Sequence, residues 1–239
     1  MRFNWNNIRL VLLFGLMIFL FAFASNRNGA RLVKDTRVTF TSENNLFITH
    51  ENVSKLLIQN YGSLKNVPKD ILDLNHLENA LKSNPMIKSA EVYLAIDGTL
   101  YAEVAQKNPI ARVSTTASYY VDDQGNYMPL STNYSARVPL ITGYVEKNYL
   151  DDVYQVADKV RKDAFLKTNV IEIHQDRDHQ IALKLRACKF SVQLGRAMYL
   201  DKKINNLKAF YQKNLKDETL NQYSMVNLKF DNQVVCTKL

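Results

Sequence analysis

The sequence predicts an α+β protein with three parts: a single N-terminal transmembrane helix, a small β-α-α-β-β domain, and a mostly antiparallel β domain with flanking helices. The first part rests on an uncharged run, "LVLLFGLMIFLFAFA", at residues 10–24. The other two rest on helical and strand-like hydrophobic patterns that alternate along the rest of the chain. With 239 residues, 46% of them hydrophobic, and only 7 Gly and 5 Pro, the chain can form one or two compact cores.

The apolar run predicts a membrane span at residues 8–25. Its uncharged part alone covers about 22 Å of a hydrocarbon core of about 30 Å, and Ile8, Arg9 and Ser25 extend it. We expect a cytoplasmic tail at 1–7 and a polar linker at 26–36. Ala22-Phe23-Ala24 also fits the small-x-small rule of signal peptidase sites, so a cleaved signal peptide is the alternative. Either interpretation places most of the chain outside the cytoplasm.

Residues 37–107 predict the β-α-α-β-β domain. A strand is expected at 37–41, followed by a helix at 50–60 that Thr49 caps. A second helix is expected to start at Asn75, because Asn75 and Glu78 have capping-box spacing, and to stop before Pro85. Both helices can cover one face of the sheet.

The stretch "SAEVYLAIDGTLYAEVAQ" predicts a hairpin that completes this domain. A two-residue turn would place Val92 opposite Glu103 and mix the two faces. A three-residue turn at 96–98, with Gly98 left-handed, instead pairs Leu94 with Leu100 and continues that register. We expect the second register because it leaves one face apolar.

Residues 108–239 predict the second domain. The strand patterns lie at 110–113, 118–121, 127–130, 137–143, 170–174, 180–186, 190–194, 223–230 and 233–238. Helices are expected from a cap at Asp151 or Asp152, and at 200–215 with Leu200, Ile204, Leu207 and Tyr211 facing inward.

Motifs for catalysis, metals or cofactors are missing from the sequence. It contains no HExxH, GxSxG, GxGxxG or GxxxxGK[ST]. His174 and His179 lie five residues apart across a predicted turn and are expected to be surface residues rather than metal ligands. Residues 122–126, "DDQGN", lack the downstream Glu of a calcium loop and are expected to form a hairpin turn.

The charge and the cysteines say little about partners. The net charge of +8 suits an anionic surface, but the basic residues are scattered, with no run longer than a pair, which argues against nucleic acid. Cys188 and Cys236 leave two alternatives, a disulfide outside the cytoplasm or two buried thiols.

Four stretches in this order resemble the FtsQ/DivIB family of bacterial cell-division proteins. They are the single apolar segment, "LENALKSNPMIKSAEVYLAIDGTLYAEVAQKNPIARV" with its "PIAR" strand, "YYVDDQGNYMPLS" followed by "PLITG", and "LGRAMYLDKKINNLKAFY" followed by "MVNLKFDNQVVCTKL". The resemblance covers nearly the whole chain.

This resemblance implies a POTRA domain at 37–107 and an FtsQ-type β domain at 108–239. It also implies an uncleaved anchor in the inner membrane, with a cytoplasmic N-terminus and extracytoplasmic domains concentrated at the septum. The family is a non-enzymatic scaffold of the divisome that needs no cofactor and links early and late division proteins. It binds FtsB/FtsL-type coiled-coil partners through the last strand, and other divisome components through the POTRA domain. The residues that correspond here are Phe230, Asn232, Gln233, Val234, Val235, Cys236 and Thr237, on an edge at 232–238. A secreted protein with a cleaved signal, either a POTRA-type binding module or an unrecognised hydrolase, is the alternative.

Overall fold

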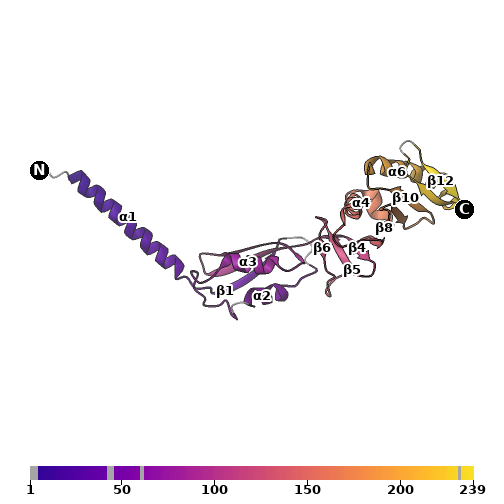
Figure 1. Cartoon of the computed structure of the whole chain (residues 1–239). Helices are drawn as coiled ribbons and strands as arrows, with labels where there is room; N and C mark the ends of the chain where they lie inside the picture. The colour runs from indigo at the N-terminus through magenta and orange to yellow at the C-terminus, as the bar shows by residue number, and fades with distance from the viewer. Residues whose placement is uncertain (1–4, 42–45, 60–61, 231–232) are drawn as a thin grey trace. The chain divides into compact units, whose positions relative to one another are not determined.

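The computed structural model describes residues 5–41, 46–59, 62–230 and 233–239 (Figure 1). Its internal contacts divide the chain into two compact units, Met1–Gln106 and Lys107–Leu239. Each unit is described by itself.

Helix α1, Trp5–Gly29, contains the apolar run. Its segment Ile8–Gly29, 22 residues long, is apolar enough to cross a membrane, and at 1.5 Å per residue it spans about 33 Å. The helix begins within the expected tail and ends four residues into the expected linker. The helix continues through Asn26, Arg27 and Asn28 because none of them is a helix-breaking glycine or proline. Arg27 also complements the negative end of the helix dipole.

The sheet of the first unit has the strand order β1-β3-β2, and α2 and α3 contribute to the same apolar core. The pairings Leu94–Leu100, Val92–Ala102 and Ala90–Val104 confirm the predicted hairpin register. Gly98 has φ +90°, and a Cβ there would lie 2.8 Å from the Leu32 carbonyl oxygen, so the turn requires glycine. The bounds are β1 Asp35–Phe40, α2 His50–Ile58, α3 Leu74–Lys82, β2 Ile87–Leu94 and β3 Thr99–Gln106. Thus β1 begins inside the segment expected to be linker.

One helix cap is as predicted and one is not. Thr49 caps α2 by accepting the Asn52 N–H. The capping box at Asn75 is wrong: α3 begins at Leu74, and Asp73 caps it by accepting the His76 N–H at 2.9 Å. The Glu78 carboxylate instead accepts the backbone N–H of Val92, on the neighbouring strand, at 3.0 Å.

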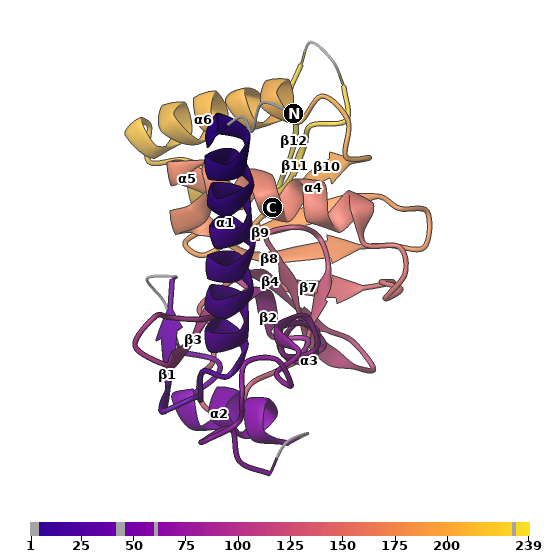
Figure 2. The ribbon, with the colours of Figure 1, turned by 90° about the vertical axis from the view of Figure 1, so that its left-hand side faces the viewer.

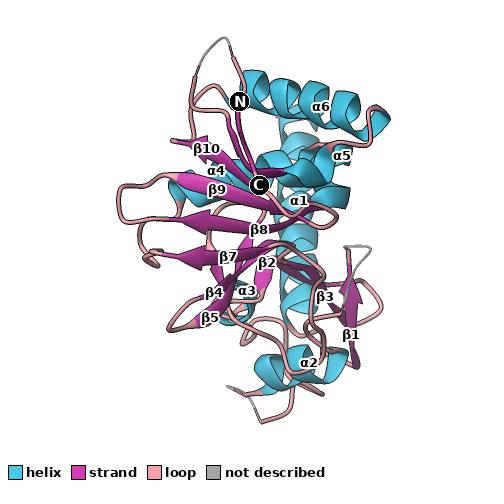
Figure 3. Ribbon diagram, turned by 90° about the vertical axis from the view of Figure 1, so that its right-hand side faces the viewer, coloured by secondary structure: helices cyan, strands magenta, loops and turns pink. Residues whose placement is uncertain are grey.

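The second unit is built on a nine-stranded sheet in the order β12-β11-β10-β9-β8-β7-β4-β5-β6, part of which Figure 3 shows strand by strand. Five neighbouring pairs are antiparallel and three are parallel (β4–β7, β7–β8 and β10–β11). The strands are β4 Pro109–Ser114, β5 Ser118–Asp122, β6 Tyr127–Met128, β7 Leu140–Gly143, β8 Val170–Gln175, β9 Ile181–Leu185, β10 Ser191–Gly195, β11 Tyr223–Asn227 and β12 Val235–Lys238. The sheet is therefore mostly antiparallel, as the sequence predicts.

Helices α4 (Asp151–Lys162) and α5 (Ala164–Asn169) lie on one face of this sheet, toward the viewer in Figure 2. Neither Asp151 nor Asp152 caps α4; both lie in its first turn, where their charge favours the positive end of the helix. Helix α5 was not predicted, because six residues are too few to show a helical period. Helix α6 (Leu200–Lys216) buries Ile204 and Leu207, and η1 (Leu220–Gln222) follows it.

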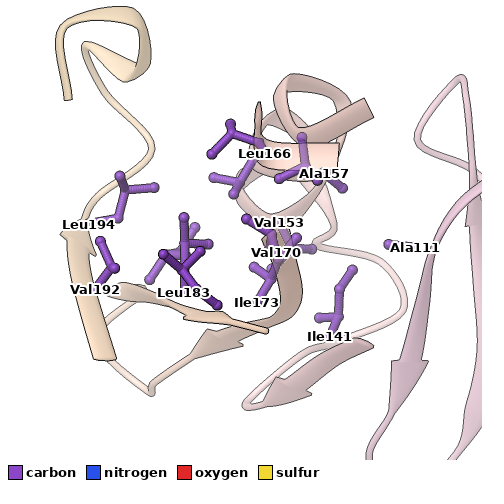
Figure 4. Packing of buried hydrophobic residues seen from close by; sticks show 14 of the residues in the cluster. Ala111, Ile141, Val153, Ala157, Leu166, Val170, Ile173, Leu183, Val192 and Leu194 are labelled. Atoms are coloured by element: carbon purple, nitrogen blue, oxygen red, sulfur yellow. The ribbon is translucent and has the colours of Figure 1, made fainter. Parts of the chain in front are cut away.

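The core of the second unit lies between these helices and the sheet. Figure 4 shows Val153, Ala157 and Leu166 from the helices above Ile141, Ile173 and other strand residues. Ala111, Ile141, Val153 and Leu194 have no exposed surface. Burial of a valine, leucine or isoleucine side chain contributes about 1.5–3 kcal/mol, so this layer stabilises the packing of the helices on the sheet.

Candidate partner-binding edge

Strand β12 lies at one end of the nine-stranded sheet, and within the described chain only β11 pairs with it. The register runs from Asn227–Val235 to Tyr223–Lys238, with a bulge between Tyr223 and Met225. The resemblance placed partner contacts on this strand. The structure places four residues in it, whereas the sequence predicted six.

The residues assigned to the edge differ in their setting. Phe230 is 47% exposed and Val235 is 39% exposed, and Gln233 and Thr237 are also exposed. Val234 and Cys236 are half-buried and pack against the core. Asn232 lies outside the described residues.

Both final strands are shorter than the sequence predicted. β11 ends at Asn227, because the Asn227 side chain accepts the Lys229 N–H at 2.9 Å and Leu228 donates to the Gln193 carbonyl of β10. Phe230 thus follows the strand instead of belonging to it. Gln233 and Val234 precede β12.

The backbone of β12 presents hydrogen-bonding groups on its open side. Leu239 donates its N–H to the Gln222 carbonyl at 2.9 Å, so residue 239 faces β11. Because backbone groups alternate along an antiparallel strand, Val235 and Thr237 also face β11, whereas the N–H and C=O of Cys236 and the N–H of Lys238 point away from it. The Lys238 carbonyl accepts the Ser224 hydroxyl of β11 at 3.3 Å, so only the other three groups have no partner among the described residues. Such unpaired groups can pair with another strand.

A hollow of about 610 Å³, here named the edge hollow, lies beside this strand. One side is a face of α6, on which the residues recur at helical spacing, and Val234 and Lys238 belong to the opposite side. Its lining residues are Asn206, Ala209, Phe210, Lys213, Asn214, Asp217, Thr219, Gln222, Tyr223, Val234 and Lys238.

Asn214, which sequence reasoning missed, fixes one wall of the edge hollow. It is 8% exposed, and its amide donates to the Phe210 carbonyl at 2.8 Å. Its Oδ1 accepts the hydroxyls of Thr219 and Tyr223 at 2.8 and 3.1 Å. The ring of Phe210 also meets Tyr223 edge-on. These contacts hold α6 against the start of β11.

The two cysteines are free thiols. Cys188 and Cys236 both pack against the core of the second unit, and burial raises the pKa of each thiol. The sequence left open a disulfide or two buried thiols. The structure has two free thiols, and each is half-buried.

The residues considered for metals have other partners. His174 Nδ1 lies 2.9 Å from the Thr142 hydroxyl, and His179 Nδ1 lies 3.4 Å from an Asp152 oxygen. Asp122 Oδ1 accepts the N–H groups of residues 124 and 126, which makes the "DDQGN" segment a hairpin turn. In the part of the chain that the structure describes, no three His, Cys, Asp or Glu side chains form a metal-binding group.

These features define the class: an α+β protein with an apolar N-terminal helix, a β-α-α-β-β domain, and a β domain whose last strand is open on one side. Comparison with known families adds two matches. Residues 35–105 match a POTRA-like domain, and residues 108–237 match the family described as FtsQ/DivIB, C-terminal related. The second match covers more than half of the chain. The chain belongs to the FtsQ/DivIB family of cell-division proteins.

Two relatives are both named cell division protein FtsQ. The protein of Geotalea daltonii is 24% identical over 180 residues, which are 70% of this chain and 64% of that protein. The protein of Myxococcus fulvus is 21% identical over 112 residues, 46% of this chain and 39% of that protein. The chain therefore spans less than two thirds of the length of either relative.

Proposed function

We propose that this chain is a non-enzymatic, membrane-anchored scaffold of the bacterial divisome. In this proposal α1 stays in the inner membrane with its N-terminus in the cytoplasm, and both domains lie outside, concentrated at the septum. The second domain binds a strand of an FtsB/FtsL-type coiled-coil partner at β12, and the POTRA-like domain binds other division proteins. The observation that carries the proposal is the position of β12 at an open end of the sheet.

The geometry of β12 suits β-strand addition. A partner strand would exchange backbone hydrogen bonds with Cys236 and accept the N–H of Lys238, since these groups point away from β11. Every second side chain of that strand would point to the same side as Val234 and Cys236, toward the edge hollow. Main-chain bonds would thus supply affinity, and the edge hollow would supply selectivity.

The opposite edge of the sheet is less suited to the same role. β6 has two residues, Tyr127 and Met128, and Met128 is buried. The Lys147 ammonium lies 3.7 Å from the centre of the Tyr127 ring. Very short edge strands and nearby lysines discourage pairing, so β12 is the better candidate.

Replacement of Cys236 tests strand addition directly. Cys236→Pro removes an N–H that points away from β11, and proline is tolerated at such positions of edge strands. Cys236→Ala is the matched control, because it removes the thiol and keeps the N–H. We expect Cys236→Pro to recover at least about tenfold less coiled-coil partner from native membranes, through one lost hydrogen bond and a steric clash, while Cys236→Ala recovers normal amounts. Equal recovery with both variants, each with normal thermal unfolding, would refute binding at this edge.

Phe230 provides a second test of the same surface. Phe230→Glu places a charge on a side chain that is 47% exposed, and we expect it to weaken recovery of the partner without unfolding the domain. Tyr199→Glu, at an aromatic side chain that is 70% exposed, is the control. Unchanged recovery with Phe230→Glu would remove this residue from the proposed site.

Two cellular measurements test the rest of the proposal. The mass of the mature protein distinguishes an anchor from a cleaved signal, since loss of about the first 24 residues would contradict the anchor. Depletion should give filamentous, undivided cells. Normal septation after depletion would contradict the division role.

A further inference from the structure

A second hollow, here named the turn hollow, lies where the parallel strands β7 and β8 end. Its volume is about 540 Å³, within the range of sites that hold small ligands or short peptide segments. The lining residues are Tyr144, Glu146, Tyr149, Gln175, Arg177 and His179. In the strand order, β8 is four strands from β12, or about 19 Å at 4.8 Å per strand, so the turn hollow is separate from the edge hollow.

Gln175 is the most unusual residue of the turn hollow. It is a polar side chain that is only 1% exposed. Its amide nitrogen donates to the Tyr144 carbonyl at 2.9 Å, and its backbone carbonyl accepts the Tyr144 N–H at 2.8 Å. Its Oε1 is buried and finds no donor among the described residues. A buried acceptor without a donor is unfavourable, and a bound group with an N–H would satisfy it.

One side chain that is always positively charged, Arg177, lies among the residues that line the turn hollow. The Glu146 carboxylate accepts the Tyr144 hydroxyl, and His179 lies near Asp152. Arg177 is exposed and makes no ion pair with any residue that the structure describes. An arginine with this freedom can hold a carboxylate by two parallel hydrogen bonds.

Two exposed tyrosines complete the site. Tyr144 and Tyr149 are 44% and 67% exposed. Tyrosine and arginine are enriched at the centres of protein interfaces, because both offer a large flat surface together with a polar group. The two hydrogen bonds between Tyr144 and Gln175 fix one wall of the turn hollow in advance, which lowers the entropy lost on binding.

We propose that the turn hollow binds an acidic, extended segment of a protein partner. A carboxylate of the segment binds Arg177, an apolar side chain next to it packs against Tyr144 and Tyr149, and an N–H of the segment donates to Gln175 Oε1. The site is independent of β12 and of the partner that β12 binds.

Peptide pools test this assignment on the full-length chain in detergent micelles. The probe is a pool of 12-residue peptides with one fixed glutamate, an apolar residue on each side of it and random residues elsewhere. The comparison pool carries glutamine at the fixed position. We expect the immobilised chain to retain the glutamate pool at least tenfold more than the glutamine pool. Arg177→Gln and Tyr149→Ala should abolish that preference, and Arg186→Gln, at another exposed arginine of a turn, should leave it intact.

Three results would overturn the proposal. The first is equal retention of the two pools, and the second is a preference that survives Arg177→Gln. The third comes from a cell-wall stem tripeptide, which also carries carboxylates and N–H groups: if it binds at the turn hollow while the glutamate pool does not, the site recognises cell wall and not a protein segment. Cys236→Pro should leave retention of the glutamate pool unchanged, so failure here is distinguishable from failure of the edge.

Discussion

The ion pair between Lys107 and Asp122 gives the sharpest test of what holds the second domain together. The two side chains are 15% and 1% exposed, and Lys107 Nζ lies 3.0 Å from Asp122 Oδ2. The other oxygen, Oδ1, accepts the N–H groups of Gln124 and Asn126 at 2.9 and 2.7 Å. Oδ2 has no aligned hydrogen-bond donor among the described residues, so its compensation comes from the nearby charge of Lys107.

Lys107→Met would leave this carboxylate buried without a counter-charge. Removing one partner of a buried pair costs about 3–5 kcal/mol of unfolding free energy. The double variant Lys107→Met/Asp122→Asn should lose less, about 1–3 kcal/mol, because asparagine keeps the Oδ1 acceptor of the turn and carries no charge. Lys162→Met is the control: Lys162 pairs with Asp158 but is 63% exposed, and such pairs contribute about 0.3–0.5 kcal/mol.

The assay is hydrogen–deuterium exchange of the full-length chain, read by mass spectrometry on peptides that cover residues 118–128. Exchange there reports the free energy of opening this hairpin, which cannot exceed that of the whole unit. A loss of less than about 1 kcal/mol in Lys107→Met would contradict the reasoning, since surface pairs already reach that value. So would a double variant that is as unstable as the single one, because the uncompensated charge would then not be the cause.

Three further changes follow from single contacts. Gly143→Ala should cost about 3 kcal/mol or more in thermal unfolding, because φ is +88° and a Cβ would lie 2.1 Å from the Gln175 carbonyl oxygen; a normal melting temperature would contradict this. Asn214→Leu should cost about 1–3 kcal/mol in urea unfolding, since two hydroxyls lose their acceptor, and an unchanged midpoint would show that they find another. Burial opposes ionisation of Asp163, but the Lys208 ammonium and two backbone N–H groups hold the pKa of its carboxyl below the usual value. Its stabilisation is therefore present above the unfolded pKa of about 3.9 and is lost as the pH falls through the lower folded pKa; Asp163→Asn should flatten the acid limb of the urea midpoint below about pH 4, and an identical limb would exclude this carboxyl as a cause.

The sequence predicted best where one periodic pattern allowed one answer. The register of Leu94 with Leu100 follows because a shift by one residue would turn apolar side chains outward. The prediction of the α3 cap failed for a local reason: Asp73 and Asn75 are both good capping residues and lie only two positions apart. The choice also depended on Glu78, whose carboxylate bonds to Val92 on a neighbouring strand. No local spacing rule contains that contact.

The candidate edge was predicted in outline only. Alternation identified a closing strand near residues 233–238, but the neighbours of a strand are not encoded in its own period. β12 lies at the edge because β11 pairs with β10 on one side and with β12 on the other, and no other described strand pairs with β12. The edge hollow depends in addition on how α6 packs, which Asn214 decides through contacts with Thr219 and Tyr223. An asparagine in a helical pattern gives no signal of such a role.

The geometry of β12 and the edge hollow also affects whether β12 pairs with β12 of a second copy of the chain. β12 is four residues long and its partner strand carries a bulge, and both features limit sheet extension. In a second copy of the chain, the apolar side chains on the matching side of β12 would be Val234 and Cys236, which already pack against that copy's own core. They cannot leave that core to enter the hollow of a neighbour without exposing it. Under the proposed function, a partner strand with free, larger apolar side chains meets no such cost. The edge hollow would therefore favour a foreign strand over self-association, and backbone pairing alone could not make that distinction.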